Sequence, residues 1–319
     1  MNVVVNKDNT VFNIIHKNGV QTSVKVSPSG KFSIDCLDRN NPIQENKNKY
    51  TVIVSSSKGC QLSCTFCHLT ANNKQFENIK EEDIINNVME AIRYVGSKVD
   101  LSSKYIKLCY MGEGEALFSL KKTKNTASDI VNKVIEEGLA CGLDGIDIST
   151  TMPKIPKDLV SSLVSMNEYF KEKHLKLNPY NHNSKDRSIV RLFYSLHHYK
   201  QEVRDTLIPK TQNIDKVVGS LDDLNSKGVN VVTHYMFMNN VNDSLEDINR
   251  LVEFTNKHYS LYKNSELRIL RFNSPTDNLI ESEKMKNIIN HLAKNLEVGK
   301  FKVQFSAGED IKAACGMFL

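Results

Sequence analysis

Residues 50–67 read YTVIVSSSKGCQLSCTFC, an apolar, β-branched run followed directly by a short loop that carries three cysteines. The run from Tyr50 to Ser56 has the composition of a buried strand. The cysteines Cys60, Cys64 and Cys67 follow with C-x3-C-x2-C spacing. In parallel α/β folds the chemistry lies at the carboxyl ends of the strands, so this loop is where we expect a site.

The chain beyond Tyr50 alternates strand-like and helix-like segments. The predicted strands cover residues 50–56, 104–111, 145–150, 188–196, 229–238 and 266–272, with a last strand from Phe301 to Phe305. Helices are predicted from the apolar stripes Ile84, Ile85, Val88, Met89 and Ile92, then Ile130, Val131, Val134 and Ile135, then Met285, Ile288, Ile289 and Leu292. Asn78 with Glu81 predicts the capping pair of the first helix. Six β-α units with right-handed crossovers predict an α/β fold closed as a partial (β/α)6 barrel.

The N-terminal residues follow a different pattern. Short apolar runs in residues 1–35, broken at Asn18-Gly19 and Ser29-Gly30, predict a small β-hairpin unit. Residues 37–49 are polar and aperiodic, which is typical of a linker. We therefore expect a β-hairpin accessory unit and linker over 1–49, and a barrel with a C-terminal tail over 50–319.

Composition sets broad limits. The 319 residues are 40% hydrophobic, with a formal net charge of +5. This mild basicity permits an RNA partner without requiring one. No run of about 18 apolar residues exists, so no membrane span is predicted. No apolar segment of signal-peptide type follows Met1, so the expected location is the reducing cytoplasm.

The cysteine spacing suits three corners of a [4Fe–4S] cluster, which would leave one iron open to a small molecule. Three other interpretations compete. Cys64 to His68 matches the C-x-x-C-H haem motif, which requires export. A structural zinc site needs a fourth ligand, and no second C-x-x-C exists. Disulfides are disfavoured by the odd count of 7 cysteines in a chain without an export signal.

Small polar residues follow several other predicted strands. Gly112 to Glu115, Ser149, Ser195 to His197, and Asn273 each end a strand. Singly, each is better explained as a turn, a capping residue or a satisfied core histidine. Together they predict a ring of donors and acceptors around one site. Cys315 stands among small residues near the C-terminus, either as inert packing or as a nucleophilic thiol.

These motifs resemble the RlmN/Cfr family of radical S-adenosylmethionine (SAM) RNA methyltransferases, which methylate ring carbons of adenosine. The resemblance spans about residues 50–319. The matching stretches, in family order, are Gly59–Cys67, Met111–Glu115, Ser149-Thr150, Ser195–His197 continuing to Arg204 and Pro209, Val241–Ser244, Phe272-Asn273, and Gly308–Ile311 through Ala314–Gly316.

The resemblance implies a [4Fe–4S] cluster on Cys60, Cys64 and Cys67, and SAM as cofactor. It implies that Cys315 is the catalytic thiol that first accepts a methyl group and then delivers it as a carbon radical to adenine. An RNA substrate, rRNA or tRNA, and a donor such as flavodoxin or ferredoxin are also implied. The residues implied to contact the cofactors are Phe66, Gly114, Glu115, Ser149, Ser195, Leu196, His197 and Asn273.

The chain departs from the family pattern in four respects. Ile53 stands where the family has a cysteine that resolves the adduct, and Val20–Val24 lacks the family's acidic residue. Glu113 and Ala116 replace the usual methionine and proline. The family's N-terminal helical RNA-docking domain is expected to be missing. These departures leave two alternatives open: radical chemistry on another acceptor or by another reaction, and a degenerate, non-catalytic iron–sulfur protein.

Three further interpretations concern single segments. Cys36 is a hypothetical substitute for the resolving thiol, although an idle buried thiol is the simpler explanation. Cys109 and Cys141 are expected to serve packing. The loop 171–187 carries Lys171, Lys173, Lys176, Lys185 and Arg187, and we interpret it as a solvated loop opposite the site rather than an RNA groove.

Overall fold

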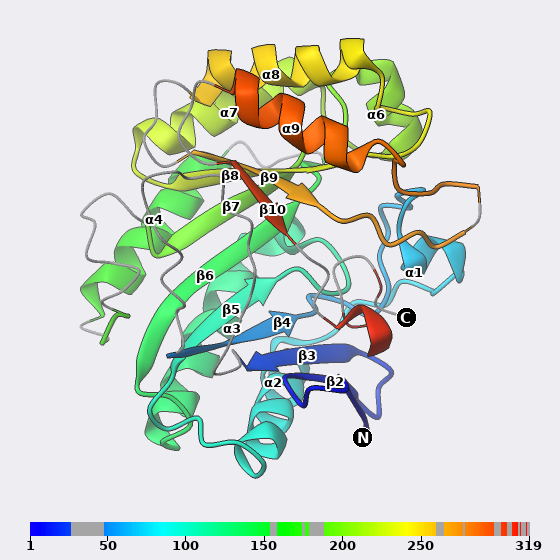
Figure 1. Cartoon of the computed structure of the whole chain (residues 1–319). Coiled ribbons are helices and arrows are strands. Elements are labelled where there is room, and N and C mark those ends of the chain that lie inside the picture. The colour runs from blue at the N-terminus through cyan, green and yellow to red at the C-terminus, as the bar shows by residue number, and fades with distance from the viewer. Residues whose placement is uncertain are drawn as a thin grey trace.

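In the computed structural model of the chain, residues 1–26, 48–153, 158–173, 176–178, 188–259, 265–276, 278–296, 301–304, 308–311, 313 and 317 are described. Their strands form one sheet in chain order (Figure 1). The strands are β1 (Asn2–Val5), β2 (Val11–Ile15), β3 (Gln21–Val26), β4 (Lys49–Val54), β5 (Tyr105–Tyr110), β6 (Gly142–Thr150), β7 (Val190–Ser195), β8 (Asn230–Met236), β9 (Glu266–Leu270) and β10 (Phe301–Gln304).

The sheet changes direction once along its length. Strands β1 to β4 pair antiparallel, whereas each pair from β4 to β10 is parallel. The predicted hairpin unit is therefore three strands joined to the barrel sheet, with Ser23 beside Ile53 in the β3–β4 register. The proposed division at residue 49 falls within one continuous sheet, and it stays a prediction.

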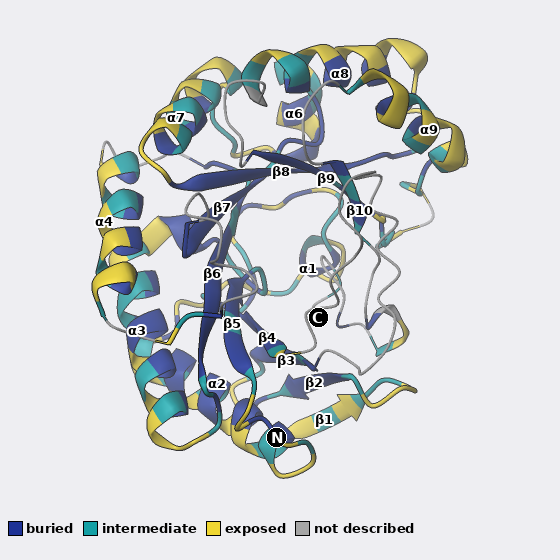
Figure 2. Cartoon of the chain, turned by 60° about the vertical axis from the view of Figure 1, so that its left-hand side comes forward, coloured by how far each residue is buried: buried dark blue, intermediate teal, exposed yellow. Residues whose placement is uncertain are grey.

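Helices cover the outer face of the curled sheet (Figure 2). They are α2 (Glu81–Gly96), α3 (Leu120–Glu136), α4 (Leu159–Glu172), α6 (Gln201–Leu207), α7 (Ile214–Ser226), α8 (Leu245–Tyr259) and α9 (Met285–Asn295). The short α1 (His68–Ala71) follows the cysteine loop, and the 3-10 turns are η1 (Ala116–Ser119) and η2 (Glu309–Ile311). The partial-barrel architecture with parallel strands and outer helices is as predicted.

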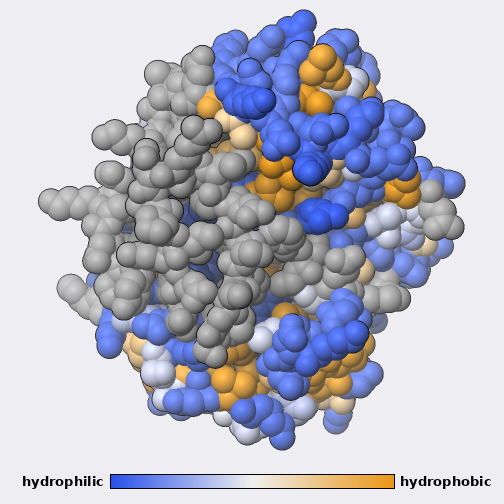
Figure 3. Space-filling view, in the orientation of Figure 1, coloured by the Kyte–Doolittle hydropathy of each residue, from blue (hydrophilic) through white to orange (hydrophobic). Residues whose placement is uncertain are grey.

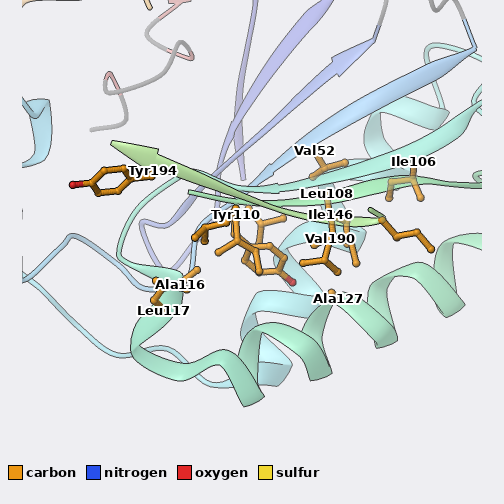
Figure 4. Packing of buried hydrophobic residues seen from close by; sticks show 14 of the residues in the cluster. Val52, Ile106, Leu108, Tyr110, Ala116, Leu117, Ala127, Ile146, Val190 and Tyr194 are labelled. Atoms are coloured by element: carbon orange, nitrogen blue, oxygen red, sulfur yellow. The ribbon is translucent and has the colours of Figure 1, made fainter. Parts of the chain in front are cut away.

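The main core lies between the parallel strands and these helices. Leu108, Ile146 and Val190 are fully buried and point toward Ala127 on α3 (Figure 4). Alternate residues of the same strands face the barrel interior, because successive side chains of a strand point to opposite faces. On that inner face Asp147 accepts two hydrogen bonds from Arg191, at 2.9 and 2.8 Å.

One local prediction was wrong. The first predicted helix, α2, begins at Glu81 with Lys80 as its N-cap residue, and the Lys80 amide donates to the Asp83 carboxylate at 3.4 Å. Asn78 is not the cap: its side-chain oxygen accepts from the Lys122 ammonium at 3.0 Å. The Asn78 side chain, which local spacing had predicted as the helix cap, therefore bonds instead to a residue 44 positions away along the chain.

No helix in the described part of the chain is long and apolar enough to cross a membrane. Hydrophilic residues predominate on the described part of the face shown in Figure 3.

Candidate active site

The three cysteines lie in the loop between β4 and α1. Cys60, Cys64 and Cys67 belong to one apolar cluster. Its other members come from this loop, from helix α6, and from the ends of β8 and β9 with the loops that follow them: Leu62, Phe66, Val203, Leu207, Ile208, Met236, Met238, Val241, Leu270, Phe272 and Leu279. The sulfurs are thus gathered in a water-poor cradle at the carboxyl edge of the parallel sheet.

Two residues with left-handed backbone shape the cysteine loop. Ser63 has φ +58° and Gly59 has φ +61°. A Cβ at Gly59 would stand 2.4 Å from the carbonyl oxygen of Gln75, so this position has no room for a side chain. The Cys67 amide donates to the Cys64 carbonyl at 3.1 Å, which closes the turn between the last two cysteines.

The thiols are close enough to influence one another. Burial, and then the neighbouring Cys67, raise the pKa of Cys60 to about 11. Burial raises the pKa of Cys64 well above its usual range, and Cys67 and Cys60 add to this effect. A bound metal removes this penalty because it stabilises the thiolate form. These buried thiols are therefore expected to lose their protons when a metal binds.

The arrangement of the three cysteines distinguishes between a single metal ion, a haem and an iron–sulfur cluster as the bound group. In the described ranges no three Cys, His, Asp or Glu side chains are placed to hold a single metal ion. A cubane differs, because it takes each thiolate at a separate iron. His68, the histidine of the haem-like motif, is buried, and its Nε2 lies 3.2 Å from the Asn273 carbonyl. Three thiols in one apolar cradle thus fit three corners of a [4Fe–4S] cluster.

Glu115 stands beside this cradle. Its carboxylate accepts from the backbone amides of Leu117 and Thr151, each at 3.1 Å. Burial raises the pKa of Glu115 to about 7, although these hydrogen bonds oppose the rise. After burial and the neighbouring thiols, the Glu115 charge also raises the pKa of Cys60 and Cys64. A buried carboxylate at this place can bind an ammonium group.

Gly114 is required by the close approach of the neighbouring loop. Its φ is +89°, and a Cβ there would lie 2.1 Å from the Ser57 hydroxyl oxygen. The Gly114 backbone therefore packs directly against the loop after β4. Whether Gly114 also contacts a cofactor stays a prediction.

The end of β7 joins the cysteine loop through an aromatic contact. The rings of Phe66 and His197 meet edge-on with centroids 4.9 Å apart. His197 is buried in a left-handed backbone conformation, φ +54°, and its Nδ1 has no partner among the described residues. Burial, with the nearby Arg204 charge, lowers the pKa of His197 to about 3, so the ring is neutral at physiological pH.

The remaining predicted residues occupy different environments. Ser149 and Ser195 lie at the carboxyl ends of β6 and β7 and are partly exposed. Asn273 follows β9 and is half-buried. Leu196 is fully buried in the main apolar core. Their contacts with a cofactor stay predictions.

Two residues that we had placed in motifs without a role hold the strand ends. Arg204 is fully buried and donates to the Ser195 carbonyl at 3.2 Å and to the Leu196 carbonyl. Asn242 donates to the His197 carbonyl at 2.7 Å and to the Met236 carbonyl at 2.8 Å. Their position within the matched stretches was the signal that could have identified them.

Cys315 and Cys36 lie outside the described residues. The described part of the tail approaches the N-terminal strands: the Asn13 side-chain amide donates to the Ile311 carbonyl at 3.5 Å. A Cβ at Gly308 would lie 2.9 Å from a methyl carbon of Val11. Gly308 and Ile311 are therefore packed against β2.

The other two cysteines outside the cradle differ in environment. Cys109 is buried on the inner face next to Ile53, and its thiol lies 3.7 Å from an Asp147 carboxylate oxygen. Cys141 is half-buried.

The described lysines of the basic loop lie away from the site. Lys171 pairs with Glu168 at 2.9 Å, and Lys173 donates to Ser128 at 3.0 Å. The Lys176 carbonyl accepts from Leu143 at the start of β6, which is the edge opposite the cysteines.

Comparison with solved structures defines the class of fold. A radical SAM methyltransferase from Sphaerobacter thermophilus matches with a TM-score of 0.67 and 18% identity, over 99% of this chain and 80% of that one. A mutant spore photoproduct lyase matches with a TM-score of 0.52 and 10% identity, over 79% and 76%. The chain thus has the fold of a radical SAM enzyme, the partial barrel that we predicted.

No protein-family model matches the chain. Curated relatives indicate which radical SAM methyltransferases the chain resembles. The dual-specificity RNA methyltransferase RlmN of Ruthia magnifica is 28% identical over 297 residues, 88% of this chain and 71% of the relative. The protein of that name from Campylobacter hominis is 29% identical, over 88% and 70%. A probable RlmN of Christiangramia forsetii is 25% identical, over 97% and 80%. The predicted resemblance to the RlmN/Cfr family is confirmed: the chain is a homologue of RlmN proteins.

Proposed function

We propose that this chain is a radical SAM methyltransferase that modifies an adenine ring carbon in RNA. The observation that carries the proposal is the convergence of Cys60, Cys64 and Cys67 with Glu115 and His197 at one edge of a radical SAM fold. Similarity to RlmN proteins over most of the chain supports the choice of RNA as substrate. We place the activity in the cytoplasm, with flavodoxin or ferredoxin as the electron donor.

Each residue of the site has a distinct task in this proposal. The three cysteines hold a [4Fe–4S] cluster, which together with SAM supplies a carbon radical able to take hydrogen from an unreactive methyl group. Glu115 binds the ammonium group of SAM, and that cation would lower the raised pKa of Glu115 and keep the carboxylate ionised. The buried His197 ring lines the site and offers its Nδ1 for a hydrogen bond. Because the ring is neutral, it adds no positive charge to the site.

Cys315 is the proposed methyl carrier. An electron-poor adenine carbon does not attack the methyl group of SAM, so polar transfer to it fails. A methyl group first placed on a thiol can be delivered as a radical from a fixed position, which removes the need for a nucleophilic substrate. The packing of Gly308 and Ile311 against β2 supports a tail anchored beside the N-terminal strands.

The proposal is tested with anaerobically reconstituted protein, methyl-labelled SAM, a reductant and RNA. We expect label on Cys315 and in RNA adenine, and we expect Cys315→Ala to abolish both. Cys141→Ala is the matched control, because its thiol is half-buried outside the cysteine cradle. Label that reaches Cys315 but never RNA would contradict RNA as acceptor.

The second candidate keeps the radical chemistry and changes the acceptor or the reaction. It is favoured by Ile53, which occupies the position where the family's resolving cysteine is expected. Formation of 5′-deoxyadenosine without any methyl on Cys315 would support this candidate. If neither product forms in cluster-loaded protein, the chain is a degenerate iron–sulfur protein.

A further inference from the structure

Glu113 is a buried carboxylate that the proposed chemistry does not use. Its side chain is fully buried, yet it meets three cationic or N–H donors. One oxygen accepts from the Gln21 amide at 2.9 Å, and the other accepts from the Gly59 amide at 2.6 Å. The Lys74 ammonium lies 3.0 Å from the second oxygen.

These partners come from three separate parts of the chain. Gln21 begins β3, Gly59 directly precedes Cys60, and Lys74 follows α1. Lys74 also donates to the Gly19 carbonyl at 3.1 Å, so the ion pair reaches the β2–β3 turn. One carboxylate thus ties the cysteine loop to the N-terminal strands.

The backbone of Glu113 strengthens the same junction. Its amide donates to the Ser55 hydroxyl at 3.0 Å, and that hydroxyl donates to the Gln21 carbonyl at 2.6 Å. Its carbonyl accepts from the Ser56 amide at 2.8 Å. The loop after β5, the loop after β4 and the start of β3 are therefore held together at this residue.

The chemistry of the junction requires an anion with two acceptor atoms. Two buried amides and the partly buried Lys74 ammonium converge on it, and an apolar side chain would leave the two amides without an acceptor. The charge also reaches the cysteines: after burial and two backbone contacts, Glu113 contributes to the raised pKa of Cys67.

We propose that the ion pair of the buried Glu113 with the partly buried Lys74 positions the cysteine loop against the N-terminal strands and sets the reduction potential of the cluster bound there. The inference rests on the proposed function in one respect, the presence of that cluster. Glu113 and Lys74 are positioning residues, since they act through Gly59 and through the field at Cys67. Reduction adds negative charge to a cluster, so a nearby anion opposes reduction and a nearby cation favours it.

The two members of the pair therefore give opposite predictions. Glu113→Gln removes the anion, keeps one acceptor oxygen and should shift the cluster midpoint to a more positive potential. Lys74→Gln leaves the anion without its cation and should shift the midpoint to a more negative potential. A loss of position alone gives no reason for opposite signs. Glu113→Gln should also hold its iron about tenfold more weakly in competition with a chelator, because loss of a partner behind metal ligands typically lowers metal affinity by at least about this factor.

The matched control is the more exposed pair Lys58–Glu77, which has the same charges at 3.1 Å and joins the cysteine loop to the segment after α1. Lys58→Gln and Glu77→Gln should leave the midpoint and the iron affinity near wild type, since water screens exposed charges. The measurements are redox titration followed by EPR, and iron retention in competition with a chelator.

Each outcome decides the inference. Shifts of opposite sign in the two buried-pair variants, with unchanged controls, support it. Shifts of equal sign, or none, overturn it. If Glu113→Gln does not fold by circular dichroism, Lys74→Gln decides alone: a more negative midpoint supports the pair, and an unchanged or more positive one overturns it. A wild-type protein that binds no cluster defeats the proposed function instead, and with it the premise of this inference.

Discussion

Substituting Glu115 by glutamine should change how the stability of the metal-free protein depends on pH. Burial raises the pKa of this carboxyl from 4.5 to about 7 in the folded state. The protonated form is therefore favoured by folding. The stability that this group contributes is fully present below the unfolded pKa and is lost as pH rises through the folded pKa.

The size of the effect follows from the two pKa values. A shift of one pKa unit corresponds to about 1.4 kcal/mol, so ionising Glu115 in the folded protein costs about 3 kcal/mol. Most of this change falls between about pH 5 and about pH 8.5, which leaves about 2–3 kcal/mol within the measurable range. The glutamine side chain of the variant does not titrate, so this part of the pH dependence disappears.

The substitution also has a cost that does not depend on pH. Glutamine offers one acceptor oxygen, whereas the Leu117 and Thr151 amides need two. The unpaired amide costs about 1–3 kcal/mol at every pH. We therefore expect Glu115→Gln to be less stable than wild type at about pH 5, and the difference to close by about 2–3 kcal/mol at about pH 8.5.

Urea unfolding of the metal-free protein at both pH values measures this difference. Glu82→Gln is the control, because Glu82 is an exposed carboxylate in the first turn of α2. A gap between wild type and Glu115→Gln that widens toward alkaline pH would refute the reasoning, because it would mean that folding favours the ionised carboxylate.

Three further substitutions test the loop, the barrel interior and the core. Gly59→Ala should lower the iron content after reconstitution, because its Cβ would meet the Gln75 carbonyl. Gly138→Ala is the control and should load iron normally, since Gly138 has a similar φ of +66° and a Cβ there would meet nothing within 4 Å. Equal iron loading of the two variants would contradict the argument that Gly59 has no room for a side chain. Asp147→Ala should cost about 3–5 kcal/mol in urea unfolding, because it leaves buried cations unpaired. Folding depresses the pKa of Asp147, so the stability that its ionised carboxylate contributes is present above the unfolded pKa and is lost on acidification. Acid unfolding of the wild-type protein that shows no such loss of stability would refute this assignment. Ile92→Ala should cost about 2–5 kcal/mol, and a loss below about 1 kcal/mol would mean that α2 packs loosely.

The features that could be predicted from the sequence are those encoded over short distances along the chain. Buried strands and helix stripes are periodic patterns, so α2 appeared with its buried face at Ile84, Val88 and Ile92 as predicted. The three cysteines lie within eight residues, so one loop can present them whatever the rest of the chain does. The order of alternating strands and helices then left a parallel, right-handed arrangement as the natural fold.

Other features depended on contacts between distant residues. Asn78 satisfied the local rule for a helix cap, but in the folded chain its side chain accepts a hydrogen bond from Lys122 instead. Glu113 read as a departure from a family motif, and only folding brought it to Gln21, which is 92 residues away.

The amino-acid sequence by itself determined the secondary structure, the cysteine loop and the class of fold, because hydrophobic periodicity and ligand spacing act over a few residues. The tertiary structure alone decided the ionisation of Glu115, the neutral state of His197 and the pairing of Glu113 with Lys74. Burial and partners set these properties, and both come from segments that the chain brings together only when it folds.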